Sequence, residues 1–306
     1  MISICIPAFR RVDYLKRLLS SLSEQSFKNF EVVITDDSGE DLIVEEYIKS
    51  TYFNFHISYY KNKSSLGSPR NWLASVSYAK GDWIKIMHDD DYFTSTTSLQ
   101  TFVNQIEPGV DCLFSGYKAV YENGGEKDMT ISQRKFDQFT HQPLSLFAKN
   151  IIGPPSVMMF KKEIKETFDE RLKWIVDWEY YIRLSLNYKL KYIKEALINV
   201  SYNPTQITNS CFLNPNIEIP ETLMFTNKYG NKLFENIHAY DAWWRLLRNL
   251  NIRSSIDIDK FSQNELVSDN VYKIIKFQSL FPVSVLKIGI ISKCLMSISF
   301  LFNRVK

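Results

Sequence analysis

The chain has 306 residues, of which 45% are hydrophobic and 14% aromatic, enough for a substantial core in one or two domains. A net charge of only +3 gives no general basis for binding nucleic acid. The four cysteines are widely spaced and form no Cys-x-x-Cys unit. This usage predicts reduced thiols in a cytosolic protein and argues against a disulfide or zinc framework.

Short apolar runs and helical patterns alternate through the first third of the chain. Residues 2–6 predict a buried strand that stops at Pro7, and the run is too short for a signal peptide. Apolar residues at helical spacing over residues 12–24 predict the first helix. Further strands are expected at residues 31–35, 56–60 and 83–87, and further helices at residues 41–50 and 69–80. This order predicts an α/β fold with a mostly parallel, Rossmann-like sheet flanked by helices.

The helix expected after residue 68 has a recognisable start signal. Ser68 is predicted to be its N-cap and Pro69 its first helical residue. Its apolar face is predicted to consist of Trp72, Val76 and Ala79.

Beyond residue 91 the alternation becomes less regular. Strands are expected at residues 111–115, 119–121, 156–160 and 191–202, and a helix at residues 177–187. From about residue 220 the chain is helical and rich in aromatic residues. We therefore expect an α/β domain over residues 1–215 and a helical C-terminal extension over residues 216–306.

The C-terminal tail differs from the rest of the chain in charge. Residues 270–306 hold six of the 37 basic residues and none of the 34 acidic ones, so the remainder has 31 basic against 34 acidic residues. A basic tail on a slightly acidic body predicts contact with an anionic surface.

Residues 280–302 are apolar over nearly the ~20 residues that a bilayer span requires. Lys287 and Lys293 interrupt the stretch, and a central lysine costs about 2.5–3.5 kcal/mol on insertion scales. The pattern favours a helix that lies on a membrane or packs against a partner. A core helix and a true span are the alternatives.

Four residues, His88, Asp89, Asp90 and Asp91, directly follow the strand expected at residues 83–87. Adjacent carboxylates at a strand end repel one another, and they are tolerated best where a cation lies among them. Mg²⁺ and Mn²⁺ take oxygen ligands and commonly combine carboxylates with substrate phosphates. The alternative is an acidic loop that caps the next helix.

A second acidic pair, Asp36 and Asp37, follows the strand expected at residues 31–35. The carboxyl ends of neighbouring parallel strands meet at one edge of a sheet, which is where α/β folds bind their ligands. Two acidic strand ends therefore predict a nucleotide-binding edge.

These motifs, taken in chain order, resemble those of the family 2 glycosyltransferases, which are inverting, metal-dependent enzymes with the GT-A fold. The resemblance covers about residues 1–205 and is of the bacterial surface-polysaccharide type. The matching segments are residues 3–11, residues 33–38, Gly67, Arg70-Asn71, residues 81–84 and Asp89–Asp91. Residues 168–170 and 177–179 resemble the acceptor side of the family's site, and residues 203–208 resemble its final active-site loop.

The sequence departs from the family pattern at two places. The family's metal motif has an acid, any residue and a second acid, which places His88 at the first acid and Asp90 at the second. Either His88 replaces an acid, or the register moves onto Asp89 and Asp91. The family's acceptor motif is Glu-Asp, and Val176 stands at its glutamate.

The resemblance implies a role for each matching residue. Asp90, helped by Asp91 or Asp89, would hold Mg²⁺ or Mn²⁺. Asp177 would be the catalytic base, with Glu179 as the second candidate. The residues expected to bind the nucleoside diphosphate sugar are Pro7, Ala8, Phe9, Arg11, Asp36, Asp37, Gly67, Arg70, Asn71, His88 and Asp89. Without the resemblance, Asp177 is equally well explained as a helix N-cap.

The implied reaction is transfer of a sugar, with inversion, from a UDP-linked donor to a hydroxyl of a glycan or of a polyprenyl-diphosphate-linked saccharide. Such a reaction belongs to O-antigen or capsule synthesis, and the tail at residues 280–306 would place the enzyme at the cytoplasmic face of the inner membrane. A nucleotidyltransferase and a non-catalytic nucleotide-sugar-binding protein are the alternatives. The first usually needs a glycine-rich phosphate loop, and residues 7–13 contain no glycine.

Overall fold

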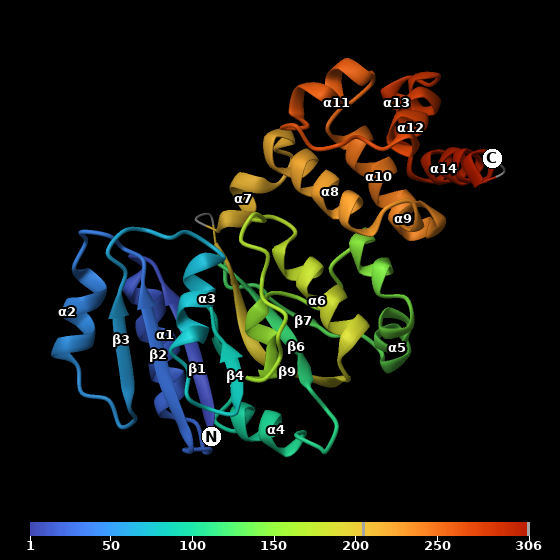
Figure 1. Ribbon diagram of the computed structural model, residues 1–306. Helices are drawn as coiled ribbons and strands as arrows, with labels where there is room; N and C mark the ends of the chain where they lie inside the picture. The colour runs from blue at the N-terminus through green and yellow to red at the C-terminus, as the bar shows by residue number, and fades with distance from the viewer. Residues whose placement is uncertain (204–205, 305–306) are drawn as a thin grey trace. The chain divides into compact units, whose positions relative to one another are not determined.

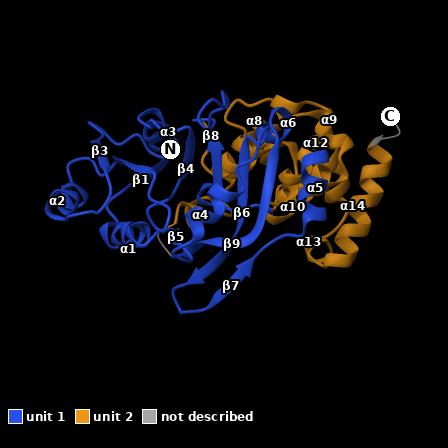
Figure 2. Cartoon of the chain, turned by 90° about the horizontal axis from the view of Figure 1, so that it is seen from below, with its two compact units in different colours: residues 1–141, 151–170, 183–204 blue, residues 142–150, 171–182, 205–306 orange. Residues whose placement is uncertain are grey.

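The computed structural model describes residues 1–203 and 206–304 (Figure 1). The chain forms two compact units, shown in different colours in Figure 2. The first comprises residues 1–141, 151–170 and 183–204, and the second residues 142–150, 171–182 and 205–306. The units interleave along the chain, and the functional division expected at residue 215 stays a prediction.

The first unit is built on a nine-stranded sheet of order β3-β2-β1-β4-β8-β6-β9-β5, with β7 paired to β6. Strands β3, β2, β1 and β4 run parallel, whereas β8 runs antiparallel to both β4 and β6. The strands are β1 (Ile2–Ala8), β2 (Phe30–Asp36), β3 (Ile57–Lys61), β4 (Trp83–Ile86), β5 (Tyr92–Phe93), β6 (Cys112–Tyr121), β7 (Glu126–Met129), β8 (Met158–Lys161) and β9 (Leu190–Tyr202). The predicted α/β class is confirmed.

Helices connect and flank these strands. They are α1 (Val12–Ser23), α2 (Ile43–Ser50), α3 (Arg70–Ser77), α4 (Ser98–Asn104) and α5 (Gln133–His141), with the short 3-10 turn η2 (Pro155–Val157). The 3-10 turn η1 (Pro143–Ala148) belongs to the second unit, and helix α6 (Val176–Asn187) begins in the second unit and ends in the first. Helix α1 buries its predicted apolar stripe, which consists of Val12, Leu15, Leu18, Leu19 and Leu22. Because β1, β2 and β4 are parallel, the segments that follow them all leave from one edge of the sheet.

The second unit contains the helical C-terminal part of the chain. Its helices are α7 (Ile207–Cys211), α8 (Pro215–Tyr229), α9 (Lys232–Glu235), α10 (Ile237–Asn249), α11 (Ser255–Phe261), α12 (Asp269–Ser279), α13 (Val283–Leu286) and α14 (Gly289–Arg304). Trp243 and Trp244 of α10 are fully buried in its core. Helix α8 continues through Pro220, which leaves the carbonyl of Asn216 without its helical donor. The side chain of Gln263 donates to that carbonyl instead, at 2.9 Å.

Two strands extend further than predicted. Strand β1 includes Pro7 and ends at Ala8. Its pairing with β4 stops at Cys5–Ile86, so Pro7 lies where no ladder bond to β4 requires its missing N–H. Residues 112–121 form one strand, because a bulge beside Gly116 carries β6 across the expected break.

Helix α3 starts one residue later than predicted. Pro69 takes the N-cap position, and no side chain caps the helix. The predicted apolar face is correct in part: Ala79 is buried, but Trp72 and Val76 are only half-buried. Within α3 the buried positions are Asn71 and Ser75. Asn71 is stabilised there by donating to the backbone oxygen of Thr35 at 3.1 Å, which fixes α3 against the sheet.

Two further expectations concern the cysteines and the apolar tail. All four cysteines are free thiols, as predicted, and Cys294 is exposed while the others are buried. Within residues 1–203 and 206–304, no helix combines the length and apolar character that crossing a membrane requires.

Candidate active site

The acidic segment expected to bind a cation lies directly after β4 and is buried. Asp89, Asp90 and Asp91 are each no more than 5% exposed. Arg11, at the start of α1, donates from Nη1 to Asp90 at 2.9 Å and from its other terminal nitrogen to Asp89. The chain thus supplies a cation of its own to two of the three carboxylates, which are otherwise costly to bury.

Backbone groups and a second arginine fix the orientation of this segment. The Phe9 amide donates to Asp89 at 3.1 Å, which ties the turn after β1 to the acidic segment. Arg17 of α1 donates to the backbone oxygen of Asp90 at 2.7 Å. Arg17 also donates to the hydroxyl of Ser201 at 2.6 Å.

The end of strand β9 supplies further donors to the same carboxylates. The Ser201 amide donates to Asp91 at 3.1 Å, and the Ser201 hydroxyl donates to the Asp90 backbone oxygen at 2.5 Å. The side chain of Asn203 donates to the Asp90 carboxylate at 3.1 Å. Ser201 and Asn203 share one face of the chain because side chains alternate along a strand.

The electrostatics of the segment favour an added cation. Burial raises the pKa of Asp89 to about 7, although Arg11 opposes the shift. Burial and the neighbouring Asp90 raise the pKa of Asp91 well above its usual range. Burial lowers the pKa of His88 to about 4, with Asp90 opposing, so the imidazole is neutral and able to coordinate. A divalent ion would favour the ionised carboxylates.

Three of these side chains fit a metal ion. His88, Asp90 and Asp91 can each present one ligand atom, and these atoms lie within 4.8 Å of one another. The Nε2 atom of His88 is buried and has no hydrogen-bond partner among the described residues. Asp89 instead faces Arg11 and the Phe9 amide. The donor set of one imidazole and two carboxylates suits Mn²⁺ and, through its oxygens, Mg²⁺.

Asp36 and Asp37, the second acidic pair, make different contacts. Asp37 accepts from the amides of Leu66 and Gly67 at 2.7 and 2.8 Å. It therefore shapes the loop between β3 and α3, in which Gly67 adopts a φ of +72° that favours glycine. Asp36 is completely buried and accepts from the Tyr59 hydroxyl at 2.6 Å.

The other expected donor-binding residues lie around the same edge of the sheet. Pro7 and Ala8 are buried in β1, and Phe9 is exposed just beyond it. Arg70 is an exposed residue that pairs with Glu170 at 3.1 Å. Of the expected donor-binding residues that precede His88, Arg11 and the Phe9 amide are those for which the described part of the chain shows a hydrogen bond to Asp89 or Asp90.

The expected base, Asp177, belongs to the second unit and lies in the first turn of α6. Its carboxylate accepts from the Asn150 side chain at 2.8 Å and from the Trp178 amide at 2.9 Å. Burial raises the pKa of Asp177 to about 7, and these hydrogen bonds oppose the shift. A carboxyl group poised near neutral pH suits general base catalysis. Glu179, the second candidate, is buried and bonded to Lys228 at 2.5 Å.

Comparison with known protein families agrees with the resemblance found in the sequence. The model for glycosyl transferase family 2 matches residues 3–168. The chain is a family 2 glycosyltransferase. Residues 3–168 of this chain contain every donor-binding and metal-binding residue that the sequence predicts.

Relatives of this family 2 glycosyltransferase include the abequosyltransferase RfbV of Salmonella typhimurium, which is 40% identical over 110 residues, or 34% of this chain and 33% of that protein. The uncharacterized glycosyltransferase YwdF of Bacillus subtilis is 25% identical over 207 residues, or 66% of this chain and 74% of that protein. The chain thus spans about a third of the first relative's length.

Solved glycosyltransferases share the fold of this chain. S. aureus TarS 1-349, in complex with UDP-GlcNAc, has a TM-score of 0.61 at 16% identity, covering 99% of this chain and 88% of that one. The mannosyltransferase PcManGT from Pyrobaculum calidifontis, in complex with GDP-Man and Mn²⁺, has a TM-score of 0.58 at 13% identity, covering 100% and 86%.

Some residues of the transferase site were not predicted. Arg17 and Ser201 both contact the Asp90 backbone, yet nothing in their local sequence marks them. Lys85, inside β4, donates to the backbone oxygen of Ser156, and burial lowers its pKa to about 7. A lysine within an apolar strand was the available signal. Pro204 and Thr205, in the expected final active-site loop, lie outside the described residues.

Proposed function

We propose that this family 2 glycosyltransferase moves a sugar from a nucleoside diphosphate sugar, UDP-linked, to a hydroxyl of a saccharide acceptor, with inversion. The observation that carries the proposal is the cluster of His88, Asp90 and Asp91, whose potential ligand atoms lie within 4.8 Å of one another. Bound there, Mg²⁺ or Mn²⁺ would supply positive charge to the departing diphosphate.

The chain's own residues would prepare the donor side. Arg11 holds Asp89 and Asp90 in place and carries a second positive charge suited to a phosphate. Asp37 fixes the loop that includes Gly67 through three donors of that loop, at 2.7 to 2.8 Å. Asp36, fixed by Tyr59, would accept from an N–H of the base.

Asp177 would take the proton of the attacking acceptor hydroxyl. A hydroxyl is a poor nucleophile at neutral pH, and a general base contributes about 10²–10⁴-fold to such a step. The raised pKa of Asp177 makes it a stronger base than an exposed aspartate. A single displacement by that hydroxyl would invert the anomeric centre.

The acceptor would be a lipid-linked saccharide used for a surface polysaccharide such as O-antigen or capsule. The similarity to an abequosyltransferase supports a polysaccharide role. Helix α14 supports contact with lipid, because it buries Ser292 and Ser299 while several of its apolar residues are exposed. Ser292 accepts from Trp244 at 2.9 Å and Ser299 bonds Tyr240 at 2.7 Å.

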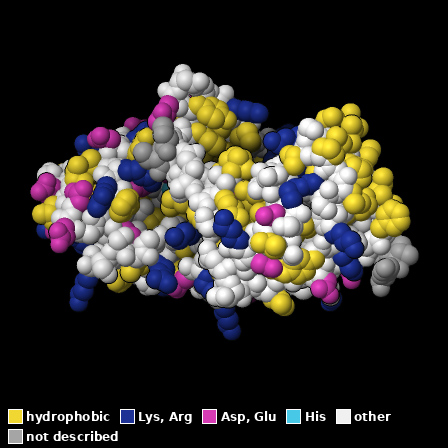
Figure 3. Space-filling model, turned by 90° about the horizontal axis from the view of Figure 1, so that it is seen from above, with side chains coloured by type: hydrophobic (Ala, Val, Ile, Leu, Met, Phe, Trp, Pro, Cys, Tyr) yellow, Lys and Arg dark blue, Asp and Glu magenta, His cyan; other side chains and the backbone are white. Residues whose placement is uncertain are grey.

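The outward side of α14 also carries large apolar residues, whereas Met296 and Phe300 are buried. Ile290, Ile298, Leu301 and Phe302 are 81%, 43%, 62% and 69% exposed, and Figure 3 shows hydrophobic side chains gathered at the right-hand end of that view. Exposed lysines accompany them, including Lys287 and Lys293. We propose that α14 lies on the anionic cytoplasmic face of the inner membrane, with its apolar side among the lipids.

The test is a panel of UDP-, GDP- and other nucleoside diphosphate sugars, assayed with Mn²⁺, with Mg²⁺ and with EDTA. Release of free nucleoside diphosphate is followed for the wild type, Asp90→Asn and the control Asp13→Asn, whose side chain is 92% exposed. Metal-dependent release from one donor, lost only in Asp90→Asn, is the expected result.

Two outcomes would overturn the proposal. Donor binding without release, even with lipid-linked saccharides added as acceptors, would indicate a non-catalytic nucleotide-sugar-binding protein. Release that is unchanged by EDTA and by Asp90→Asn would remove the metal from the reaction.

A further inference from the structure

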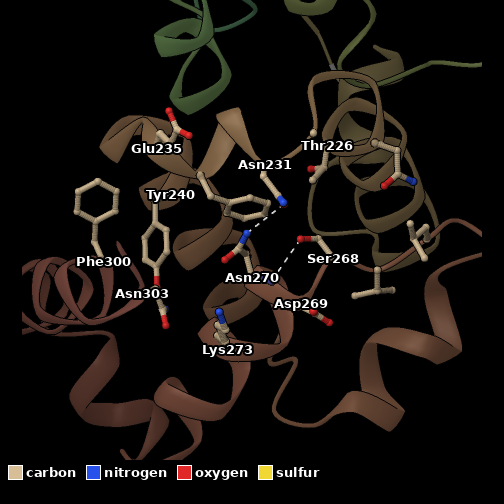
Figure 4. Close-up of a pocket in the computed structure, with 15 residues that line it drawn as sticks. Thr226, Asn231, Glu235, Tyr240, Ser268, Asp269, Asn270, Lys273, Phe300 and Asn303 are labelled. Atoms are coloured by element: carbon tan, nitrogen blue, oxygen red, sulfur yellow. Dashed lines mark hydrogen bonds between the residues drawn. The ribbon is translucent and has the colours of Figure 1, made fainter. Parts of the chain in front are cut away.

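A pocket lies within the helical second unit, and none of the residues expected to bind the donor or the metal lines it. Its volume is about 970 Å³, at the upper end of the ~300–1,000 Å³ typical of small-molecule sites. Its walls come from α8, α9, α10, α12 and α14 and from the loop that precedes α12. Figure 4 shows the side chains that line it.

The pocket is rich in neutral amide groups. Four asparagines line it: Asn227, Asn231, Asn270 and Asn303. An apolar ligand such as a lipid tail would have to desolvate these groups without replacing their hydrogen bonds with water. The lining therefore favours a ligand that is itself covered with hydrogen-bonding groups.

The charge of the lining argues against a phosphate or nucleotide. Lys273 is one positive group, and Glu235 and Asp269 are two negative groups, so the formal balance of these three is −1. All three are exposed. An anion would meet more repulsion than attraction here, whereas a neutral ligand is indifferent to this balance.

Two amides form an arrangement suited to neighbouring hydroxyl groups. The side chain of Asn270 donates to the side-chain oxygen of Asn231 at 3.3 Å, and the backbone N–H of Asn270 donates to the Ser268 hydroxyl at 3.2 Å; Figure 4 shows these groups close together. The Asn231 Nδ2 donor and the Asn270 Oδ1 acceptor have no protein partner in the described parts of the chain. A vicinal diol can accept from the first and donate to the second.

Aromatic and amide groups also meet in the lining of the pocket. Tyr240 and Phe300 pack edge to face with ring centroids 5.3 Å apart. The side chain of Asn303 donates to the Tyr240 hydroxyl at 2.7 Å, which leaves the Asn303 carbonyl oxygen to accept from a ligand. Rings beside polar amides suit a molecule that has both C–H and O–H surfaces.

We propose that this pocket binds neutral sugar residues of the acceptor glycan. The inference rests on the proposed function for the identity of the saccharide, but its recognition chemistry comes from the pocket alone. The site would hold part of the acceptor that does not react, so its loss would weaken acceptor binding without altering donor chemistry.

The test measures saccharide binding directly on the full chain. A panel of neutral di- to tetrasaccharides of glucose, galactose, mannose, rhamnose and N-acetylglucosamine is screened by saturation-transfer NMR, and hits are titrated. The double substitution Asn231→Ala with Asn270→Ala should weaken binding roughly tenfold or more, since it removes two hydrogen-bonding groups. The control Asn216→Ala, an exposed asparagine of α8 outside the pocket lining, should leave binding unchanged.

Three other results would overturn this proposal. The first is that no saccharide of the panel binds, and the second is that the double substitution does not affect binding. The third is that inorganic phosphate binds in place of saccharides and that its binding depends on Lys273. A short peptide that displaces a bound saccharide from the wild type but not from the double variant would reassign the pocket to peptides. Release of nucleoside diphosphate to water, measured on the same variants, should stay at the wild-type rate, so failure of this proposal is distinguishable from failure of the transferase function.

Discussion

Arg11 Nη1 lies 2.9 Å from the carboxylate of Asp90, so a residue that precedes α1 neutralises charge at the end of β4. The same guanidinium reaches Asp89. Burial of the guanidinium lowers the pKa of Arg11, but the negative charges of Asp89 and Asp90 outweigh this effect, so the pKa is raised. This relationship links stability to the proposed metal site.

Replacing Arg11 should therefore destabilise the protein in a way that metal can offset. Arg11→Ala leaves buried carboxylates without their cation, and we expect a loss of about 3 kcal/mol in the free energy of unfolding. Excess Mn²⁺ should restore part of this, because it binds the folded state. Denaturant titrations with and without MnCl₂ provide the measurement. Lys16→Ala on the same helix, an exposed site, is the control, and equal effects of the two substitutions would contradict the expectation.

The metal register left open by the sequence can be resolved by comparing four substitutions. If His88, Asp90 and Asp91 are the ligands, His88→Ala, Asp90→Asn and Asp91→Asn should each weaken Mn²⁺ binding by about tenfold or more. Asp89→Asn should have the smallest effect. Calorimetric titration of Mn²⁺ in the absence of donor measures each affinity. The largest loss in Asp89→Asn would instead support the register on Asp89 and Asp91.

The pH profile of turnover should report Asp177. The base must be deprotonated to accept a proton, so activity should rise as pH increases through about 7, the raised pKa of this carboxyl group. Asn150 donates to Asp177 and lowers that pKa, so Asn150→Ala should move the midpoint to higher pH. Initial rates at saturating donor and acceptor, between pH 5 and 9, provide the check, and an unchanged midpoint would count against the assignment.

The Asp177→Asn variant separates catalysis from binding. We expect turnover to fall by about 10²–10⁴-fold while the donor Kd stays within error of the wild type. Asp128→Asn, which alters an exposed carboxylate of β7, should retain full activity. Wild-type turnover in Asp177→Asn would remove this residue from the mechanism and direct attention to Glu179.

Membrane attachment should depend on the outward face of α14. The pair Ile298→Lys with Leu301→Lys should reduce sedimentation with anionic vesicles by about tenfold or more, because each apolar side chain contributes about 1.5–3 kcal/mol when fully buried. Lys293→Glu should reduce binding mainly at low salt. Ile256→Lys in α11, at a residue that is 78% exposed, is the matched control, and a loss in that control equal to the loss in the α14 pair would disprove the orientation.

Much of the α/β half could be predicted because its elements are local. The stripe of α1 is periodic in the sequence and buried in the structure. Strand β2 ends at Asp36, and three aspartates follow β4 after Met87 and His88. The buried face of α3 could not be predicted in this way. Asn71 is buried because the Thr35 carbonyl and the side chain of Asn62 lie within hydrogen-bonding distance, and that depends on which strands are neighbours.

Site residues that closely follow a strand could be predicted from the sequence. The acidic segment after β4 was found because its composition is unusual. Arg17 and Ser201 were not, since they are 184 positions apart in sequence and become relevant only when β9 returns to the edge where α1 begins. Glu221 is similar: it accepts from the amides of Lys173 and Trp174 at 2.8 Å, and this long-range contact fixes the segment before Asp177.

Helix α14 has a practical consequence for work with the isolated protein. The hydroxyl groups of Ser292 and Ser299 bond Trp244 and Tyr240 inside the helical unit, so the helix cannot rotate to hide its isoleucines without breaking those bonds. In solution, the exposed apolar side chains of α14 stay in contact with water unless lipid, detergent or another protein molecule covers them. We expect preparations without lipid or mild detergent to self-associate as concentration rises, and conditions that mimic a bilayer surface to yield monodisperse material.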